Sequence, residues 1–496
     1  MDRDSSEILA WAEAEAERRK KEILTATDSC AVVGMSYYVS NDGDDENDGS
    51  RSRPWQTLQK VSQAELQEGD GVFFRRGDLF RGFVQTKAGV TYGAYGEGEK
   101  PKFYGWDYSL ADPSLWEIWN ESRKIWKLKK PILDCGTLVF NDGEFHSRKL
   151  IPSYRGGRFV CREEEGRIFD PAVEMTRNLD IVCFYEERMN VKPSKGEDFP
   201  VPQIDDQSFG TLLLRCDEGN PGAVFSSVEA VPRRNLIQVK GNDRVTVDNL
   251  CLKYCGAHAI GAAGPCITGL HVSNCEIGWI GGSIQNYYGT DPNYPQGMRG
   301  SVTRYGNGVE IYGGCDDYVV ENCYIYQVYD AAITHQVTTN GKTYRMNNIR
   351  YLNNLVEHCV YSIEYFLEKT QGDAESVISD CIMEGNMLRF SGYGWGQQRH
   401  NTDTPAHIKG WSYENTARDF EIRNNIFDRA AYRMLHLVAK EAGSLPEMDQ
   451  NTYVQAKGGM LGQYGANAEK EPEILPFTEE NIQRVFRDNE AQIYIV

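Results

Sequence analysis

The stretch that decides the fold is VDNLCL at residues 247–252, because variants of it return five times further along the chain. The later copies read VSNCEI (272–277), VENCYI (320–325), YLNNLV (351–356), MEGNML (383–388) and IRNNIF (422–427). Their register residues, at intervals of 25, 48, 31, 32 and 39, are Asn249, Asn274, Asn322, Asn353, Gly385 and Asn424. One structural repeat of about 25 residues with loops of variable length explains these intervals.

Such a repeat predicts a coil of short parallel strands. Asn side chains aligned at successive turns can hydrogen-bond one another and the backbone, while the apolar positions stack inside. Each coil then advances the axis by the strand spacing of ~4.8 Å. A leucine-rich horseshoe is the competing solenoid, but its Leu-x-x-Leu-x-Leu signature is missing. We therefore expect an all-β protein, a right-handed parallel β-helix with an N-terminal helix and a β-rich insertion.

The domain plan follows from where the repeat starts and stops. Residues 4–24 have Ser5 or Ser6 as an N-cap and an apolar stripe at helical spacing, which predicts one helix packed across an end or side of the solenoid. The expected segments are an N-terminal helix (1–30), first coils (31–102), a β-rich insertion (103–220), main coils with a groove (221–445) and a C-terminal cap (446–496). The cap includes a short helix with Thr478 as N-cap.

The net charge and the composition limit the kinds of partner that the protein can bind. A formal charge of −19 and a pI near 5.0 argue against a nucleic acid or an anionic membrane surface. We see no export signal and no run of 18 apolar residues. The 13 cysteines lack CxxC pairs, and several fall inside the repeat, so we expect buried, reduced thiols and a cytoplasmic protein. The acidic run 42–48 lacks EF-hand spacing and is interpreted as a solvated turn; no cofactor or metal is expected.

A second strand follows each register residue, and its outward side chains form the candidate catalytic set. If Val309, Ile333, Ile363, Ile408 and Leu435 point inward, the two-residue period of a strand sends the next residues outward. Those outward residues are Glu310, Thr334, Glu364, Lys409 and His436. Glu310 and Glu364 then lie two coils apart, ~9.6 Å between backbones. The candidate catalytic residues are Glu364, Glu310, Asp330, His335 and Lys409.

Two chemistries fit these residue types. Paired carboxyls can cleave a glycosidic bond, one protonating the leaving oxygen and the other activating water or attacking the anomeric carbon. Lys409 with Arg399 or Arg433 would instead suit a lyase, which needs a base and a cation that neutralises a uronate carboxylate. Histidines such as His335, His407 and His436 could also ligate a metal with Glu364, although isolated histidines more often pack locally.

Aromatic residues concentrate near the same strand, where the C–H faces of sugar rings can stack on them. Tyr287, Tyr288, Tyr393 and Trp395 are the preferred platforms, because Gly-rich loops such as GYGWGQQRH (392–400) cannot bury them all. The full substrate-binding set is Tyr287, Tyr365, Tyr393, Trp395, Gln398, Arg399 and His436.

The Asn-rich coils, the opening YYVSNDG (37–43) and the segments GDGVFFRRGD (69–78) and YGAYGEG (92–98) resemble bacterial pectate-lyase-like right-handed β-helix proteins over about two-thirds of the chain. That superfamily includes glycoside hydrolases, polysaccharide lyases, epimerases and non-enzymatic adhesins. The resemblance to β-helix glycosidases of the β-xylosidase type implies acids on successive coils. Glu364 lies near the corresponding strand, but Phe366 stands where an acid is expected.

The resulting expectation is a glycosidase acting on oligosaccharides. The alternatives are a lyase or epimerase directed at uronate-containing glycans and a carbohydrate-binding solenoid without catalysis.

Overall fold

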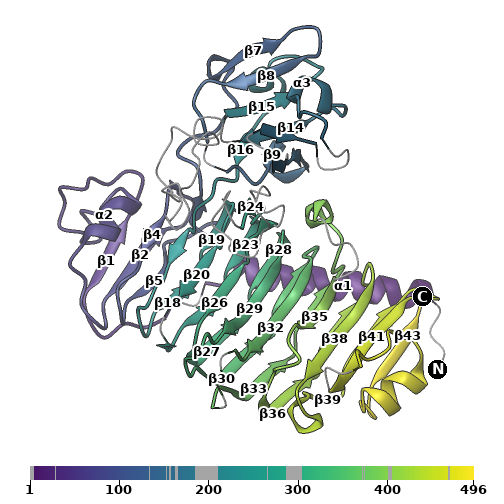
Figure 1. Ribbon diagram of the computed structural model, residues 1–496. Coiled ribbons are helices and arrows are strands. Elements are labelled where there is room, and N and C mark those ends of the chain that lie inside the picture. Colours follow the sequence, from purple (N-terminus) through teal and green to yellow (C-terminus); the bar gives the residue numbers. More distant parts are fainter. Residues whose placement is uncertain are drawn as a thin grey trace.

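The strands stack side by side into a solenoid that has three long sheets (Figure 1). The computed structural model describes residues 5–27, 30–132, 134–151, 153–155, 158–161, 166–184, 211–264, 266–285, 304–370, 372–373, 375–399, 405–466 and 470–496. Within each sheet, strands from successive coils pair in parallel almost throughout. The predicted right-handed parallel β-helix is therefore confirmed.

Each coil contributes one strand to each sheet. Sheet I contains β1 (Ser36–Val39), β2 (Gly71–Arg75), β5 (Thr91–Tyr95), β18 (Thr246–Asp248), β22 (His271–Ser273), β27 (Cys315–Glu321), β30 (Arg345–Leu352), β33 (Val377–Glu384), β36 (Ala417–Arg423) and β39 (Glu447–Asp449), with β21 (Ile267–Thr268) pairing beside β27. Sheet II contains β3 (Leu79–Arg81), β6 (Lys102–Tyr104), β19 (Cys251–Cys255), β23 (Glu276–Ile280), β28 (Tyr324–Val328), β31 (Leu355–Glu357), β34 (Met387–Arg389), β37 (Ile426–Asp428), β40 (Thr452–Gln455) and β43 (Gln492–Ile495). Sheet III contains β4 (Val84–Gln85), β17 (Ile237–Gln238), β20 (Ile260–Ala263), β26 (Val309–Tyr312), β29 (Ala331–Thr338), β32 (Tyr361–Glu368), β35 (Ala406–Gly410), β38 (Arg433–Ala439), β41 (Met460–Ala466) and the antiparallel β42 (Leu475–Pro476).

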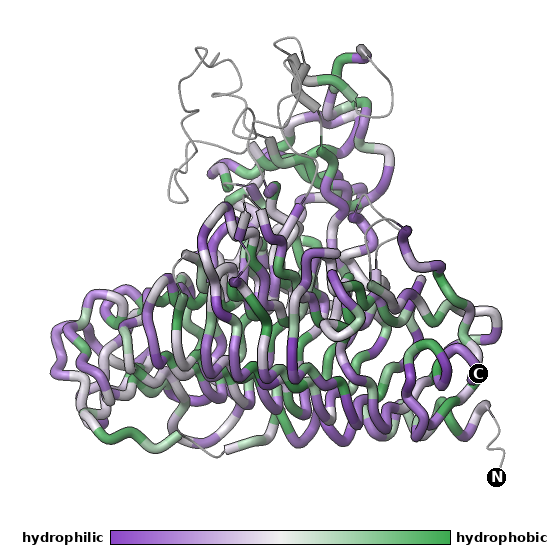
Figure 2. The backbone as a smooth tube through the Cα atoms, turned by 60° about the horizontal axis from the view of Figure 1, so that its bottom comes forward, coloured by the Kyte–Doolittle hydropathy of each residue, from purple (hydrophilic) through white to green (hydrophobic). Residues whose placement is uncertain are grey.

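The core consists of apolar columns that run along the solenoid axis. In sheet I the first apolar residue of each repeat is paired with its counterpart in the next coil, and all of them are buried. That column is Val247, Val272, Val320, Tyr351, Met383 and Ile422. Figure 2 shows the same alternation as repeated switches between hydrophobic and hydrophilic residues along the coils. Two-residue periodicity therefore fills the interior while leaving one side chain in two outside.

The register residues occupy equivalent corners between sheets I and II, as predicted. Asn249, Asn274, Asn322, Asn353 and Asn424 all have φ between 50° and 59°, the left-handed conformation that Asn tolerates. The expected amide ladder, however, is built mainly by the next residue along the chain. Asn354, Asn386, Asn425 and Asn451 are buried, and each side-chain nitrogen donates to the side chain of the following coil at 2.8–3.1 Å.

The chain leaves the coil after β6 and returns at β17, so that β4 pairs directly with β17 and β6 with β19. Between them lie β7 (Trp116–Asn120), β8 (Ile125–Leu128), β9 (Leu138–Phe140), β10 (Phe145–His146), β11 (Arg148–Leu150), β12 (Ser153–Arg155), β13 (Arg158–Val160), β14 (Asp180–Phe184), β15 (Thr211–Arg215), β16 (Val228–Ala230) and the short helices α3 (Pro171–Glu174) and α4 (Pro221–Val224). This insertion has its own apolar core and stands off one side of the solenoid in Figure 1.

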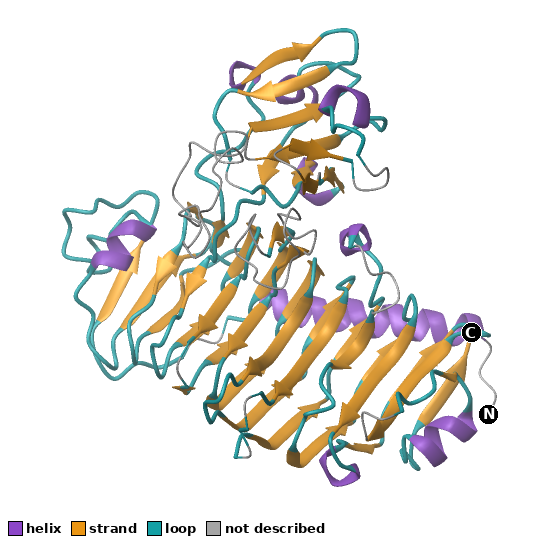
Figure 3. Cartoon of the chain, in the orientation of Figure 1, coloured by secondary structure: helices purple, strands orange, loops and turns teal. Residues whose placement is uncertain are grey.

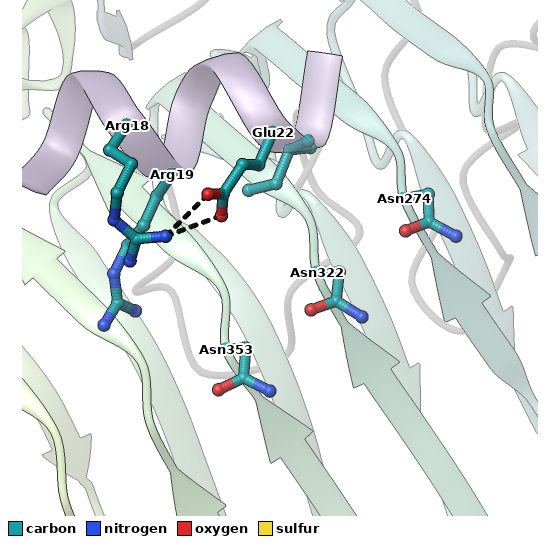
Figure 4. A pocket seen from close by; sticks show the side chains of 7 residues that line it. Arg18, Arg19, Glu22, Asn274, Asn322 and Asn353 are labelled. Atoms are coloured by element: carbon teal, nitrogen blue, oxygen red, sulfur yellow. Dashed lines mark hydrogen bonds and ion pairs between the residues drawn. The ribbon is translucent and has the colours of Figure 1, made fainter. Parts of the chain in front are cut away.

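Helix α1 (Ser5–Thr25) runs along the solenoid across the strands of sheet II (Figure 3). Its residues Ala12, Ala16 and Ile23 pack against Tyr324, Leu355, Met387 and Ile426 at the starts of four of those strands. Towards its C-terminal end the helix faces the Asn corners across a pocket of about 370 Å³, where Arg18 binds Glu22 (Figure 4). No helix of the described chain is long and apolar enough to cross a lipid bilayer.

Both ends of the solenoid carry short helices. Helix α2 (Leu58–Gln63) lies in the first coils, and the turn Asn481–Val485 lies at the C-terminal end. There, Ile482 and Phe486 are fully buried in the main core, and the Asn481 amide donates to Thr478 Oγ1 at 3.2 Å. The C-terminal segment therefore covers the last coil with its own apolar side chains.

Candidate functional site

One row of side chains on sheet III contains most of the predicted catalytic residues. Strand pairing sets Glu310 beside Thr334, Thr334 beside Glu364, Glu364 beside Lys409 and Lys409 beside His436. The alternate residues, Val309, Ile333, Ile363, Ile408 and Leu435, are all fully buried in the main core. The predicted register and the predicted outward row are therefore both present, on the strands β26, β29, β32, β35 and β38 of Figure 1.

Glu364 occupies the middle of the row in an environment that favours its protonated form. Its exposed fraction is 6%, and burial raises its pKa to about 8, with the charge of Asp330 contributing in the same direction. The Arg399 guanidinium and a hydrogen bond from Trp411 act in the opposite direction without cancelling the shift. Glu364 is therefore mainly a neutral acid at pH 7.

Asp330, immediately before β29, is held by an ion pair with Arg399 Nη1. The Arg399 guanidinium also lies over the Tyr361 ring at 5.3 Å from its centre. On balance the pKa of Asp330 lies above its ordinary value, because burial raises it more than the nearby Arg399 charge lowers it. Because the guanidinium contacts Asp330 directly, the negative charge of the two neighbouring carboxyls resides on Asp330 and the proton on Glu364.

Glu310 is fixed by two residues that the sequence analysis did not identify. Asn307 Nδ2 donates to Glu310 Oε2 at 2.5 Å, and His258 Nδ1 lies 2.8 Å from the same oxygen. Asn307 also accepts the Ala331 amide through Oδ1 at 2.8 Å, which ties Glu310 to the coil that carries Asp330. The signal in the sequence was slight: Asn307 stands three residues before Glu310, and His258 stands two residues before the paired strand β20.

The other half of the row is basic. Lys409 is buried, with Nζ 4.2 Å from the centre of the Trp411 ring. Arg433 Nη1 donates to Gln463 Oε1 in the next coil. Burial, together with the charges of Lys409 and Arg433, lowers the pKa of His436 to about 2, so His436 is a neutral imidazole.

Two of the predicted site residues, one catalytic and one substrate-binding, have side chains inside the coil and do not belong to the site. His335 and Tyr365 have the inward parity of their strands, and their rings stack at 5.8 Å between centres. His335 Nδ1 lies 2.7 Å from the Tyr351 hydroxyl, and burial lowers its pKa to about 3. Neither side chain reaches the face that carries Glu364, so the catalytic role for His335 and the sugar-binding role for Tyr365 are wrong.

Among the predicted loop platforms, Trp395 is corrected and Tyr393 is exposed as expected. Trp395, in the short helix Trp395–Gln398, is 1% exposed, and its indole N–H donates to the Gln327 carbonyl at 2.7 Å. Its ring packs against Tyr329 with 4.9 Å between centres, so it offers no face to a ligand. Tyr393 is 40% exposed and packs edge-on against Phe390. Tyr287 lies outside the described residues.

The loop that carries Arg399 is held by the insertion. Gln398 Nε2 donates to the Ser147 carbonyl at 2.9 Å, and Gln398 Oε1 accepts the Lys149 amide at 3.1 Å. Lys149 in turn forms a fully buried ion pair of 2.5 Å with Asp134, whose other oxygen accepts the Ile284 amide of the coil at 2.7 Å. Gln398 therefore serves as an anchor between the insertion and the loop.

A cavity of about 260 Å³ lies beside the ion pair, and Arg399 is part of its wall. The remaining lining residues are Val360, Gly392, Gly396, Gln397, Pro405 and Ala431. Within the described part of the chain, no group of three or more His, Cys, Asp or Glu residues is arranged to hold a metal ion. The site is thus a set of three carboxyls, Glu310, Asp330 and Glu364, here called the acidic cluster, next to cations on the same face.

Fold and site together define a parallel β-helix with an acidic cluster on one outer face. Similar solved structures include the GH136 lacto-N-biosidase from Eubacterium ramulus, at 14% identity and a TM-score of 0.40, covering 98% of this chain and 70% of that one. XylC in complex with xylose is 13% identical, with a TM-score of 0.38 and coverage of 93% and 83%. A rhamnogalacturonan lyase is 10% identical, with a TM-score of 0.35 and coverage of 86% and 75%. No protein-family model and no curated protein sequence matches the chain.

Proposed function

We propose that this protein is a glycoside hydrolase acting on oligosaccharides, with Glu364 as the general acid and Asp330 as its carboxylate partner. The observation that carries the proposal is the difference between the surroundings of two neighbouring acids. Burial raises the pKa of Glu364 to about 8, whereas the Arg399 guanidinium stabilises the charge of Asp330. Acid pairs whose environments drive their protonation states apart are the arrangement that glycosidic cleavage requires.

In the proposed reaction, protonated Glu364 gives its proton to the glycosidic oxygen as the bond to the anomeric carbon breaks. The Asp330 carboxylate either activates a water molecule or attacks the anomeric carbon, with Arg399 holding it in place. Glu310, whose charge also raises the pKa of Glu364, helps to keep the acid protonated. His258 and Asn307 position Glu310 for this role.

A lyase acting on uronate-containing glycans is the second candidate, and one observation favours it. Lys409 is paired in register with Glu364 and lies in the basic half of the row. In that reaction Lys409 would remove the proton at C5, and a neighbouring guanidinium would neutralise the uronate carboxylate.

The test is a panel of neutral and uronate-containing oligosaccharides, assayed for new reducing ends and for ultraviolet absorbance. We expect reducing ends without absorbance, and a loss of kcat/KM of roughly 100-fold or more in Glu364→Gln and in Asp330→Asn. Glu368→Gln is the matched control, because Glu368 lies on the same strand at its exposed end. Absorbance of an unsaturated uronate that depends on Lys409 and survives Glu364→Gln would establish the lyase instead.

A further inference from the structure

A second line of outward side chains on sheet III lies two residues along each strand from the charged row. Pairing sets Tyr312 beside Gln336 and Gln336 beside Phe366. Their neighbours in sequence, Ile311, Val337 and Leu367, belong to the main core. The side chains of this line therefore point to the same side of the sheet as Glu310 and Glu364. Two of the three are aromatic, whereas the first line contains charged residues.

Trp411 extends this line over the acidic cluster. Its amide donates to the Tyr365 carbonyl at 3.1 Å, which continues the pairing of β35 with β32 by one residue. The ring turns back over the charged row, with Lys409 Nζ 4.2 Å from its centre, and the indole is near enough to Glu364 to lower the pKa of that carboxyl. Even so, 37% of Trp411 remains exposed. A ring that contacts the general acid and is still open to solvent is placed to meet a bound substrate.

Tyr312 and Phe366 continue the aromatic surface away from the acid. Their ring centres are 6.4 Å apart in an edge-to-face arrangement, and Tyr312 is 38% exposed. The Tyr312 hydroxyl donates to Thr338 Oγ1 at 3.3 Å, which fixes the ring against the sheet. Beyond Tyr312 the paired residue is Ala263, an exposed small side chain, so the paired strand puts no bulky side chain at that end of the line.

We propose that Tyr312, Phe366 and Trp411 form an aromatic platform that binds the sugar rings of a glycan running along the solenoid axis. Sugar rings present C–H faces that stack on aromatic rings, and the amide of Gln336 lies within the line to bind hydroxyl groups. From β26 to β35 the platform spans three strand spacings, about 14 Å, which is longer than one sugar ring. The role of the platform in catalysis depends on the proposed hydrolase function. The binding of a glycan to the platform can nevertheless be measured without catalysis.

The experiment is affinity electrophoresis in gels that contain arabinoxylan, galactan or polygalacturonate, with Glu364→Gln as the parent so that no polymer is cleaved. We expect at least one polymer to retard the parent. Tyr312→Ala and Phe366→Ala should each weaken that retardation roughly two- to tenfold. Trp119→Ala is the matched control, because Trp119 is 44% exposed on the insertion, and it should bind as the parent does.

Unchanged retardation in both platform variants, or no retardation of the parent by any of the polymers, would overturn the platform. These outcomes are separate from the failure of the hydrolase proposal, which is decided by product analysis with the wild-type protein. Trp411→Ala is left out of the decisive set, because its loss also changes the hydrogen bonding of Glu364.

Discussion

At the scale of single residues, the protonation of Glu364 determines the expected pH dependence. In the proposed mechanism, Glu364 loses its proton as pH rises through its pKa of about 8, so kcat/KM should fall on the alkaline side near pH 8. In Trp411→Phe the hydrogen bond that lowers this pKa is absent while an aromatic ring remains. The alkaline limb should therefore move to higher pH, which a pH–rate profile would detect.

Trp119→Phe provides the control for that profile, since it makes the same change on the insertion, away from the acidic cluster. An alkaline limb that stays in place in Trp411→Phe would mean that the limb reports a group other than Glu364.

The same residue should cost the protein stability. Glu364 has an ordinary pKa of 4.5 and a raised pKa in the fold. The free energy of unfolding is therefore unaffected by its ionisation below pH 4.5 and decreases as pH rises from 4.5 towards 8, where the unfolded chain is ionised and the folded chain is not. At pH 7 the penalty is about 3 kcal/mol, from which the loss of a hydrogen bond to Trp411 must be subtracted. We expect Glu364→Gln to raise the free energy of unfolding by about 1–3 kcal/mol at pH 7. Thermal unfolding at pH 7 and pH 4.5 tests this, and a gain of equal size at both values would contradict the linkage.

At the scale of elements, the corner residue and the ladder residue that follows it have different roles. Asn353 takes the left-handed corner conformation outside the coil. In the next coil the ladder residue Asn386, which follows the corner residue Gly385, lies inside and bonds to Asn354, Asn425 and the Tyr351 carbonyl. Asn386→Ala removes these side-chain bonds and leaves the buried Asn354 amide without its acceptor, so we expect a loss of about 2–4 kcal/mol in unfolding free energy. Chemical denaturation would measure it.

Asn353→Gly is the matched comparison, because glycine accepts a φ of 55° without strain. Its cost should stay within about 1 kcal/mol and come from the greater freedom of the unfolded chain. Equal destabilisation by the two variants would show that the interior ladder contributes no more than the corner conformation.

The repeat could be predicted from the sequence because parity and turn geometry are local properties. The corner asparagines set the register, and period two then placed Glu310, Glu364, Lys409 and His436 on one face. The same rule places His335 and Tyr365 inside, and they were misassigned because their residue types were weighed above their parity. His258 was missed because its contact with Glu310 crosses between neighbouring coils, which a single sequence does not display. Asn307 is local to Glu310, three residues before it, and was missed because a turn asparagine has no distinctive pattern.

Loop residues posed a different problem. Trp395 stands in a Gly-rich segment that suggested an exposed ring, but the segment folds back onto Gln327 and Tyr329 and buries it. Arg399 was predicted to bind a uronate carboxylate or the substrate, and only the fold shows that it pairs with Asp330. Long-range packing decides such positions, and local pattern does not.

At the scale of the whole molecule, the insertion and the solenoid meet at the loop that carries Arg399. The insertion is locked to the coil by the buried Lys149–Asp134 pair and by the bond from the Ile284 amide to Asp134. Gln398 then links the Ser147 carbonyl and Lys149 amide of the insertion to the residue next to Arg399. The insertion therefore reaches the acidic cluster through the loop that carries Arg399, with Gln398 as the main link, and none of its described residues adds a carboxyl to the cluster.

The variant Gln398→Ala tests whether the position of Arg399 depends on the insertion. Without the anchor, Arg399 is held less firmly on Asp330, and because the Arg399 charge lowers the pKa of Glu364, that pKa should rise. We expect kcat to fall roughly tenfold, the alkaline limb to move to higher pH, and amide hydrogen exchange to increase over residues 395–399. Asn178→Ala, which removes a side chain bonded to Glu218 within the insertion, should change none of these. If the loop exchanges no faster and the pH profile is unchanged in Gln398→Ala, the bonds from Trp395 to Gln327 suffice to hold Arg399, and the insertion has no part in positioning it.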